Sequence, residues 1–528
     1  MAALLAATPP LQAQAQVRLP ALGESAQADF SVGAEHRLGL QIMSEIRRDP
    51  DYLDDPVLLE YVQSIFQPLV AAARARGDIE PDIDRLFAWE PFLVRDSVVN
   101  AFALPGGYVG IDLGLISITD NADELAAVLA HELSHVTQRH IARKIVNSQH
   151  NSMIGVAALI VGILAATRSN NADIANAAIM GGQAAAVQGQ INFSRDMERE
   201  ADRMGYAVMA KAGFSQAGVA QMFDKLESAN RLNDSGSFPY LRDHPLTAER
   251  IAEAQSRALF AGHKPSRPPL PHALMQIRAR VLMNRDPAVM RRFEAQAGGG
   301  DPGTPLRERL QAMYAGALAA SIQRDNALAL RSADAALALA SAAPGPDPQA
   351  LRLVELLQAQ VRDAAGEPAG ALAALDSIQL DAATRAPMML RAQALLDLER
   401  KAAKPDIAVL RASVETLQSW VSDHANDASA WSLLGETAEA AGLHLRALRA
   451  GAEARAALGD LGGAIDRLRA AQTAARGSDG SDFIEASIVD ARLRELQSQR
   501  RELESDARNG RGPGFDAGAA PRAADFRR

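Results

Sequence analysis

The chain has 528 residues, of which 48% are apolar and 4% aromatic, and its formal net charge is −9. This length suggests about three domains, or two and a repeat array, and the alanine-rich, aromatic-poor composition favours closely packed helices. The charge gives no support for nucleic-acid binding. The absence of cysteine excludes a thiolate nucleophile, a disulfide framework and a cysteine-ligated zinc, so any metal site must use His, Asp and Glu.

The N-terminus, MAALLAATPPLQAQAQVRLP, has features of an export signal. A short apolar run is followed by Ala13-Gln14-Ala15, a small-x-small pattern typical of cleavage sites. No Lys or Arg comes before the apolar run, so the predicted signal peptide over residues 1–15 lacks its basic start. The alternative is an alanine-rich tail without a signal. The first interpretation predicts a periplasmic protein.

Helical periodicity dominates residues 35–76, on both sides of an interruption at DPDYLDDP. Residues 86–111 are rich in β-branched and aromatic side chains, and Pro105-Gly106-Gly107 provides a turn between two such runs. They predict a small antiparallel sheet. A helix then begins near Asn121, where acidic residues suit a helix N-terminus, and continues through AVLAHELSHVTQRH at 127–140.

That helix contains the pattern H-E-x-x-H at His131, Glu132 and His135. Residues four apart lie on one helix face, so the two imidazoles point toward one place. They could hold a zinc ion while Glu132 deprotonates a water molecule. The alternative is an ordinary solvated helix face. The sequence does not favour the metzincin extension, because Gln138 and Ile141 stand where it requires Gly and His.

Two apolar segments follow, MIGVAALIVGILAA at 153–166 and IANAAIMGGQAAAV at 174–187. Each is shorter than the ~20 residues that span a bilayer. We expect a helical hairpin packed on the protein, or alternatively a peripheral contact with a membrane surface.

Helical patterns resume over residues 189–228, where MEREADRMG supplies three carboxylates. Glu198 and Asp202 share a helix face, and Glu200 points elsewhere. Glu198 can therefore act as a third ligand while Asp202 orients a ligand histidine. The residues alone leave the choice between Glu198 and Glu200 open.

The proline-rich stretch at 262–271 is the clearest domain boundary. Beyond it, residues 430–454 fit the tetratricopeptide pattern W-x2-L-G followed by small residues. Segments 365–375 and 458–468 repeat half of that motif. These patterns predict a tetratricopeptide-like array, with generic alanine-rich hairpins as the alternative. A tail over 506–528, rich in Gly, Arg, Ala and Asp, is predicted to be disordered.

H-E-x-x-H followed by S-R-x-x-E-x-E-A-D-x-x-G resembles the zinc metallopeptidase family that includes HtpX and the CaaX prenyl endopeptidases. NAFALPGGYV at 100–109 and His244-Pro245-Leu246 also resemble motifs of that family. The resemblance implies a mainly α protein. A gluzincin-type α+β metallopeptidase domain with a small sheet would cover residues 16–262, and an α-helical tetratricopeptide-like repeat domain would cover residues 272–505.

The resemblance also implies site residues. One Zn2+ per chain would be held by His131, His135 and Glu198, with Glu132 as the general base and Asp202 orienting a ligand histidine. An edge strand beside the cleft would bind an extended substrate through main-chain hydrogen bonds. That strand comprises Asn100, Ala101, Phe102 and Ala103.

His244 has three candidate roles. It could stabilise the oxyanion of the tetrahedral intermediate as a catalytic residue. It could instead occupy the open zinc position and hold the enzyme inactive. The third alternative is a surface loop histidine without either role.

The order of signal peptide, zinc domain and repeats resembles family members that act in the periplasm. It implies a zinc-dependent endopeptidase whose substrates are misfolded or stalled outer-membrane β-barrel proteins, with chaperone-like support of their assembly. The repeats would provide a concave surface that docks on the outer-membrane assembly machinery. Two alternatives stay open: a repeat-based periplasmic chaperone or adaptor with a silent zinc site, and a processing protease with one defined substrate.

Overall fold

A computed structural model describes residues 30–147, 195–232, 240–241, 244–260, 269–298, 303–378, 384–476 and 483–508. The predicted signal peptide and the apolar segments 153–166 and 174–187 lie outside these ranges. The predicted tail also lies outside them, except that the last helix continues to Arg508. Within the described ranges, no helix is long and apolar enough to cross a membrane.

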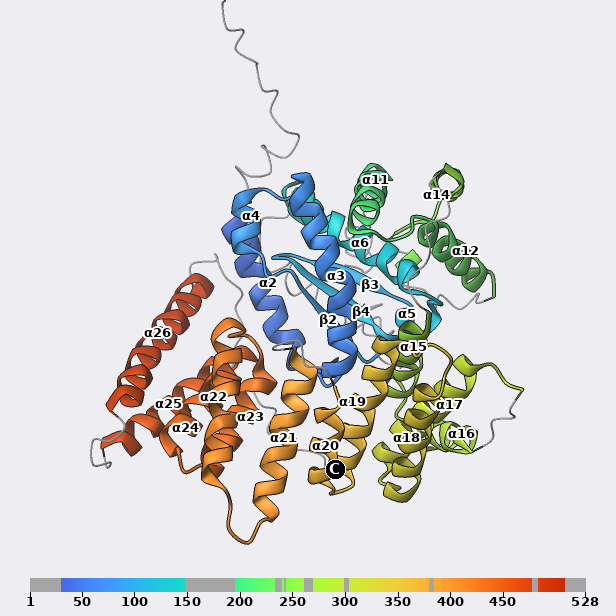
Figure 1. Ribbon diagram of the computed structural model, residues 1–528. Helices are drawn as coiled ribbons and strands as arrows, with labels where there is room; N and C mark the ends of the chain where they lie inside the picture. The colour runs from blue at the N-terminus through green and yellow to red at the C-terminus, as the bar shows by residue number, and fades with distance from the viewer. Residues whose placement is uncertain are drawn as a thin grey trace, which may run out of the picture.

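The N-terminal part contains helices around a small sheet (Figure 1). Its elements are α2 (Val32–Ile46), β1 (Tyr52–Leu53), α3 (Pro56–Arg76), α4 (Pro81–Leu86), β2 (Glu90–Val94), β3 (Ala101–Leu104), β4 (Tyr108–Asp112), α5 (Leu113–Ile118), α6 (Ala122–Thr137), α7 (His140–Asn147), α11 (Arg195–Ala212), α12 (Ala217–Leu232) and α14 (Ala248–Phe260). This arrangement confirms the predicted mainly α fold with a small sheet.

The C-terminal part consists of helices wherever it is described. They are α15 (Pro269–Leu282), α16 (Pro287–Ala297), α17 (Leu306–Gln323), α18 (Asn326–Ser341), α19 (Pro348–Ala364), α20 (Pro368–Asp376), α21 (Arg385–Lys401), α22 (Ile407–Asp423), α23 (Ala428–Ala440), α24 (His444–Ala457), α25 (Leu461–Arg476) and α26 (Phe483–Arg508). From α16 onward, helices pack mainly on their neighbours in sequence. At one such contact, an added Cβ at Gly435 of α23 would lie 3.6 Å from the Ala450 Cβ of α24, so small residues allow close packing there.

The described strands form one sheet in the order β1-β2-β4-β3. β3 and β4 form the predicted antiparallel hairpin around residues 105–107, and β3 lies at the sheet edge. β2 and β4 pair in parallel, with Phe92 opposite Gly110, so the prediction of an antiparallel sheet is wrong for this pair. A turn motif indicates the pairing only of the two strands that it connects. The β2–β4 pairing joins strands that are not consecutive in sequence, so no turn motif indicates it.

Helix α6 lies at the centre of the N-terminal part, between α3, α11, α12 and β3. Its N-cap is Asn121, whose side chain accepts a hydrogen bond of 2.9 Å from the Glu124 backbone N–H. Asp123 and Glu124 add negative charge to the first turn, which stabilises a helix start. Every residue of α6 is buried, so the predicted metal-binding helix is enclosed on all sides.

Three ion pairs join the start of α3 to the C-terminal helices, and we call them the α3 seam. Each contains one acidic residue of the segment 54–60 and one arginine from a different helix, namely α15, α19 or α21. The pairs are Asp54–Arg385 (2.7 Å), Asp55–Arg278 (2.7 Å) and Glu60–Arg352 (2.5 Å).

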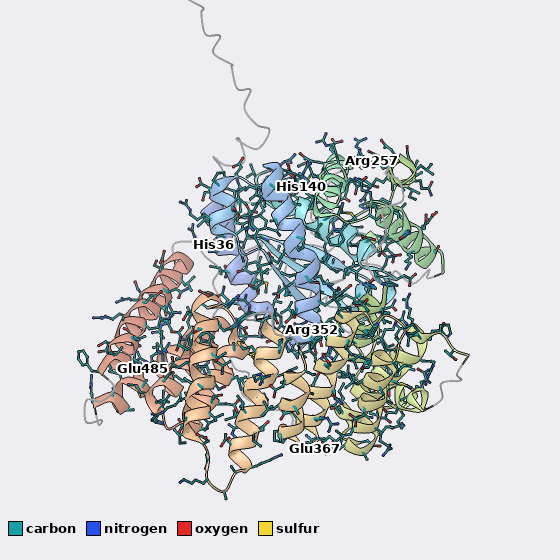
Figure 2. The ribbon with its side chains drawn as sticks, in the orientation of Figure 1. His36, His140, Arg257, Arg352, Glu367 and Glu485 are labelled. Carbon is teal, nitrogen blue, oxygen red and sulfur yellow. The ribbon has the colours of Figure 1, made fainter. Side chains whose placement is uncertain are left out.

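The apolar core also crosses from one part to the other. One cluster of buried side chains contains residues from Val32 to Ala386, on both sides of the boundary predicted at 262–271. Arg352 of the α3 seam lies where the two parts meet (Figure 2). The domain limits given above remain predictions.

Candidate metal centre

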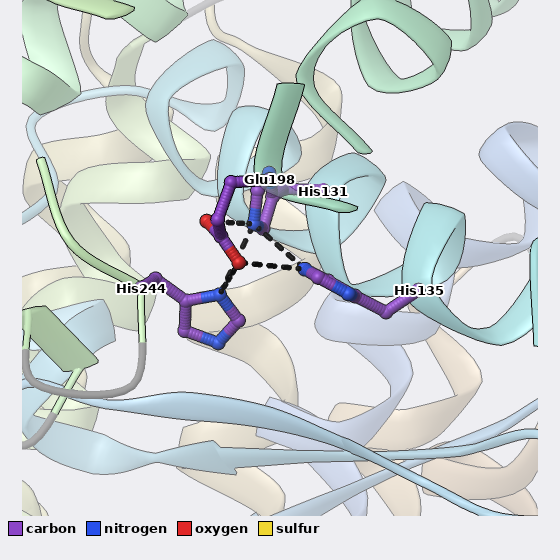
Figure 3. Close-up of side chains that lie close together, drawn as sticks. All are labelled: His131, His135, Glu198 and His244. Carbon is purple, nitrogen blue, oxygen red and sulfur yellow. Dashed lines mark hydrogen bonds and ion pairs between the residues drawn. The ribbon is translucent and has the colours of Figure 1, made fainter. Parts of the chain in front are cut away.

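Four buried side chains from three segments converge beside α6. His131 and His135 come from α6, Glu198 from α11, and His244 from the segment before α14. One ligand atom of each lies within 4.8 Å of the others. The structure therefore brings together the two histidines of H-E-x-x-H, the expected carboxylate and the histidine whose role was open (Figure 3).

The spacing of these atoms suits a tetrahedral zinc ion. Nε2 of His131 lies 3.0 Å from Nε2 of His135 and 3.4 Å from Oε2 of Glu198. Nε2 of His135 lies 3.5 Å from Oε1 of Glu198. Ligands at ~2.0 Å from a tetrahedral centre are about 3.3 Å from one another. Both the distances and the nitrogen and oxygen donors fit zinc.

The two neighbouring glutamates of α11 have different partners in the structure. Glu198 is 2% exposed and faces the histidines. Glu200 instead lies 3.1 Å from His140 and 2.8 Å from Arg143. Asp202, which shares the face of Glu198, has Oδ1 3.0 Å from Nδ1 of His131. Because a carboxylate only accepts, Nδ1 of His131 is the donor, and Nε2 faces the cluster, where it can bind either a proton or a metal ion.

A glycine allows α11 to carry these carboxylates to α6. A Cβ added at Gly205 would lie 3.3 Å from the carbonyl carbon of Ala130 and 3.4 Å from the backbone nitrogen of His131. Contacts this short would push the two helices apart. Gly205 ends the motif E-A-D-x-x-G, so the motif encodes both the carboxylates and the close helix crossing.

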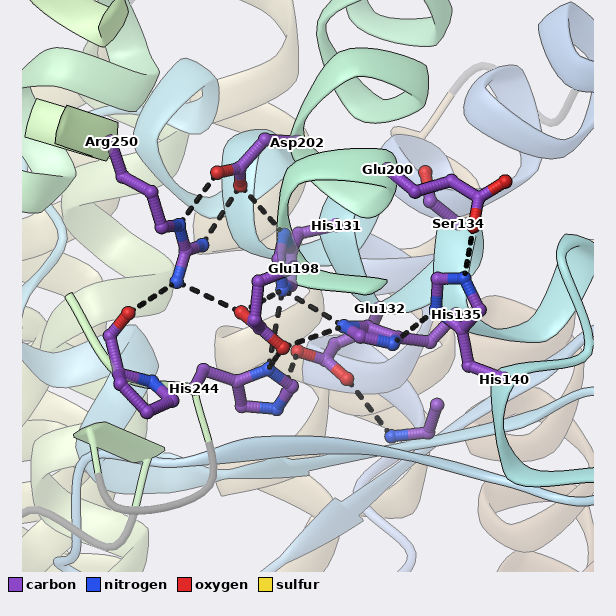
Figure 4. Close-up of polar contacts among 12 residues, drawn as sticks. His131, Glu132, Ser134, His135, His140, Glu198, Glu200, Asp202, His244 and Arg250 are labelled. Carbon is purple, nitrogen blue, oxygen red and sulfur yellow. Dashed lines mark hydrogen bonds and ion pairs between the residues drawn. The ribbon is translucent and has the colours of Figure 1, made fainter. Parts of the chain in front are cut away.

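Arg250 is a site residue that the sequence analysis missed. It is 5% exposed. Its guanidinium lies 2.6 Å from Oδ2 of Asp202 and 2.8 Å from Oε2 of Glu198, and it also donates to the Pro245 carbonyl at 2.9 Å (Figure 4). A possible signal was the demand for a cation created by two carboxylates on one face, but nothing in HPLTAER singles out this arginine.

His140 is the second residue that was missed. It is completely buried, and its Nδ1 lies 2.8 Å from Nδ1 of His135, on the ring side away from the cluster. The hydrogen bond with His140, with Arg143 alongside, holds the pKa of Glu200 at about 2. Residue 140 is off the face of residue 135 in a regular helix, so helical spacing could not indicate this contact.

Glu132 connects the site to the edge strand. Its Oε2 accepts a hydrogen bond of 3.0 Å from the backbone N–H of Ala103 in β3. Among the described residues, its Oε1 has no hydrogen-bond partner. Burial raises the pKa of the Glu132 carboxyl group above its usual value. A buried carboxylate with one oxygen outside any hydrogen bond can exchange a proton with a small molecule bound beside it.

The remaining residues predicted for the edge strand lie beside Ala103. Ala101, Phe102 and Ala103 belong to β3, and Asn100 directly precedes it. Asn100 is 7% exposed and accepts through its carbonyl from the Asp112 N–H at 3.1 Å. In an antiparallel pair, alternate residues face the partner strand, so Ala101 and Ala103 direct their main-chain groups away from β4.

His244 is buried at 3% exposure, which does not fit the surface-histidine alternative. Its Nδ1 lies 3.2 Å from Nε2 of His131 and 3.1 Å from Oε1 of Glu198. Its Nε2 lies 3.5 Å from Oε1 of Glu132. Its ring also stacks on Tyr240 at a centroid distance of 4.7 Å. This position is compatible with ligation and with contact to a reacting group.

The electrostatics of the cluster suit a cation. Burial alone would lower the pKa of His131, but its hydrogen bonds with Asp202 and Glu198 outweigh burial and raise this pKa to about 10. Burial lowers the pKa of His135 far below its usual value. Burial would raise the pKa of Glu198, but His244 and His131 outweigh it and hold this pKa far below the usual range. The site therefore favours positive charge on one imidazole, and a divalent ion can replace that proton.

Comparisons with known proteins relate this chain to peptidases. The model of peptidase family M48 matches residues 59–258. A putative β-barrel assembly-enhancing protease of Vibrio cholerae is 38% identical over 258 residues, which are 48% of this chain and 51% of that protein. The β-barrel assembly-enhancing protease of Escherichia coli is 34% identical over 240 residues, 46% of this chain and 47% of that protein.

A more distant relative is the mitochondrial metalloendopeptidase OMA1 of Schizosaccharomyces pombe. It is 29% identical over 233 residues, 43% of this chain and 62% of that protein. The chain thus spans about half the length of the β-barrel assembly-enhancing proteases it matches. The match of residues 59–258 to the model of peptidase family M48 confirms the resemblance seen in the sequence motifs.

Proposed function

We propose that this chain is a zinc-dependent endopeptidase that cleaves misfolded or stalled outer-membrane β-barrel proteins in the periplasm. The observation that carries the proposal is the convergence of His131, His135 and Glu198 at distances that suit zinc, with Glu132 next to them. The alternative, a chaperone or adaptor with a silent site, does not need this complete and buried set of donors.

His131, His135 and Glu198 hold the ion in this proposal. When bound, zinc supplies Lewis acidity, which makes a water molecule acidic near neutral pH and polarises a carbonyl group. Asp202 and Arg250 keep His131 and Glu198 oriented through the contacts described above.

Glu132 is the general base. It takes a proton from water as the water oxygen attacks the carbonyl carbon of the scissile peptide bond, and it later gives that proton to the leaving amine nitrogen. The pKa raised by burial suits both steps, because the group must accept a proton and then release it near neutral pH.

The edge strand β3 binds substrate by strand addition. Ala101 and Ala103 direct main-chain groups to the open edge, where an unfolded segment can pair with them. Because the Ala103 N–H also donates to Glu132, a substrate strand that reaches this residue competes with the general base for the same donor. Strand pairing selects extended backbone rather than particular side chains, which suits unfolded substrates.

The substrate class and the compartment rest on the relatives. The names of the Vibrio cholerae and Escherichia coli proteins refer to β-barrel assembly. We assign the same class of substrate and a periplasmic location to this chain, with the helical repeats supporting assembly in a chaperone-like way and docking on outer-membrane assembly machinery.

The test measures bound zinc and casein hydrolysis together, for the purified wild type and for Glu132→Gln. We expect about one zinc per chain in both proteins and a loss of roughly 100-fold or more in hydrolysis for the variant. No zinc in either protein would contradict the proposal and favour the adaptor. Zinc in both without hydrolysis would indicate a latent enzyme, in which His244→Ala should raise activity if His244 blocks the ion and leave it absent if His244 is catalytic.

A further inference from the structure

We infer that His140 is a positioning residue of the metal centre, which fixes the ring of His135 and the nitrogen that His135 offers to the ion. The inference rests on the proposed function, because it assumes that His135 is a metal ligand. It assigns a role to a buried histidine that lies outside the cluster of four.

The first step concerns the proton on His140. Nε2 of His140 lies 3.1 Å from Oε2 of Glu200, and Nη1 of Arg143 lies 2.8 Å from the same oxygen. A carboxylate has no proton to give, so Nε2 of His140 is the donor in this contact. In neutral His140, the other nitrogen, Nδ1, then carries a lone pair.

The second step concerns which ring nitrogen of His135 carries the proton. The two Nδ1 atoms of His140 and His135 lie 2.8 Å apart, so one must donate and the other accept. Because Nδ1 of His140 accepts, Nδ1 of His135 is the donor. Nε2 of His135 is then left with its lone pair, and this atom lies 3.0 Å from Nε2 of His131 in the cluster.

Both metal-binding histidines of α6 thus donate through Nδ1 and direct Nε2 to the cluster, but different groups fix this orientation. Asp202 accepts from His131 directly, whereas Glu200 acts on His135 through His140. Groups behind metal-ligating histidines commonly fix the tautomer and ring orientation in this way, and their loss typically costs about 10- to 100-fold in metal affinity.

The backbone explains how His140 reaches His135. Arg139 follows α6 with φ of +51°, a left-handed conformation that is unfavourable for a residue other than glycine. Its side chain donates to Oε2 of Glu35 at 2.8 Å and to the Phe30 carbonyl at 2.7 Å, both in buried positions. These contacts with the chain around α2 hold the sharp bend that turns His140 back toward α6.

The test compares zinc dissociation constants, measured by competition with a chromogenic chelator, for the wild type, His140→Leu and His140→Asn. Leucine removes the acceptor, and asparagine keeps an oxygen near the position of Nδ1. We expect zinc binding to weaken about 10- to 100-fold for His140→Leu and to stay within roughly threefold of the wild type for His140→Asn.

His272→Leu is the matched control. His272 is 1% exposed and has contacts at both ring nitrogens, with Tyr61 and Thr119, but it is not part of the cluster. The His272→Leu variant should be less stable to heat than the wild type but should bind zinc as tightly. If His140→Leu binds zinc as tightly as the wild type, the inference is wrong while the proposed function stands. If the wild type binds no zinc, the proposed function itself fails.

A second measurement covers the case in which His140→Leu does not fold. Ring-15N NMR of the zinc-loaded wild type distinguishes the tautomers of each imidazole. We expect the proton of His140 on Nε2 and that of His135 on Nδ1. A proton on Nδ1 of His140 would overturn the inference without any substitution.

Discussion

The metal centre and the α3 seam both bury several charged side chains, but they arrange them in opposite ways. In the seam, each carboxylate meets one guanidinium, as in the pair Asp55–Arg278 at 2.7 Å. In the metal centre, His131 and His135 point ring nitrogens at one another from 3.0 Å. An ion pair of opposite charges needs no further partner, whereas two imidazole nitrogens this close need a cation between them, either a proton or a metal ion. The comparison separates charges buried for architecture from charges buried for chemistry.

Glu198→Gln changes the metal centre and should produce the largest effect, a loss of zinc affinity. Losing a ligand should weaken zinc binding by more than the roughly 100-fold that follows loss of a group behind the ligands. Hydrolysis should fall with it. The folding of the zinc-free protein should change little, because Arg250 keeps two contacts with Asp202. Chelator competition and urea unfolding measure both quantities, and a large loss of stability without a loss of zinc affinity would reverse our assignment.

Arg278→Met tests the architectural side. Arg278 is fully buried, with Asp55 and Tyr314 among its partners. Its loss leaves the Asp55 carboxylate buried without its ion-pair partner, which typically costs about 3–5 kcal/mol of unfolding free energy. Zinc affinity should not change. The double variant Arg278→Met, Asp55→Asn should recover part of the stability, and failure to do so would mean that lost packing causes the effect.

Gly205→Val tests the helix packing that supports the metal centre. A Cβ at this position meets the backbone of Ala130 at 3.3 Å, and backbone cannot rotate away. We expect a loss near the upper end of the ~1–3 kcal/mol typical of overpacked cores, together with weaker zinc binding, because α11 carries Glu198. If the variant is destabilised but binds zinc normally, then α6 and α11 can move apart without displacing Glu198 from the zinc site.

The pH dependence of stability should depend on His272, which packs close to the seam. Burial lowers its pKa to about 4. The unfolded chain binds a proton below its ordinary pKa of ~6.5, and the folded chain does not until about pH 4, so stability is complete above ~6.5 and is lost as pH falls. Between pH 7 and 5 we expect the wild type to lose about 2 kcal/mol more than His272→Gln in urea unfolding. If the wild type and His272→Gln lose the same unfolding free energy between pH 7 and 5, groups other than His272 cause the pH dependence.

The sequence predicted those parts of the site that depend on local spacing. His131 and His135 share a helix face, as do Glu198 and Asp202, because residues four apart on a helix do so. The preference for Glu198 over Glu200 came from the family resemblance, and the contacts of Glu200 with His140 and Arg143 now give it a physical reason.

The parts that were missed depend on how distant segments meet. Arg250 reaches Glu198 and Asp202 across 52 and 48 positions of the chain (250 − 198 and 250 − 202). His140 reaches His135 only because Arg139 adopts a left-handed conformation, which residue preferences do not predict. The parallel β2–β4 pairing likewise joins strands that no single turn connects. In each case packing, rather than local pattern, decides the contact.

The distribution of the donors along the chain has a mechanical consequence. His135 on α6 and Glu198 on α11 are separated by 63 positions (198 − 135). An ion that joins them closes this loop, as a disulfide would, in a chain that contains no cysteine. The proposed zinc is thus a reversible cross-link between α6 and α11 as well as a cofactor. Free zinc at 100 times its dissociation constant adds about 2.7 kcal/mol to the free energy of unfolding. Chelation would then loosen the crossing of α6 and α11 as it stops catalysis, so that an inactive copy is also one more easily unfolded and removed.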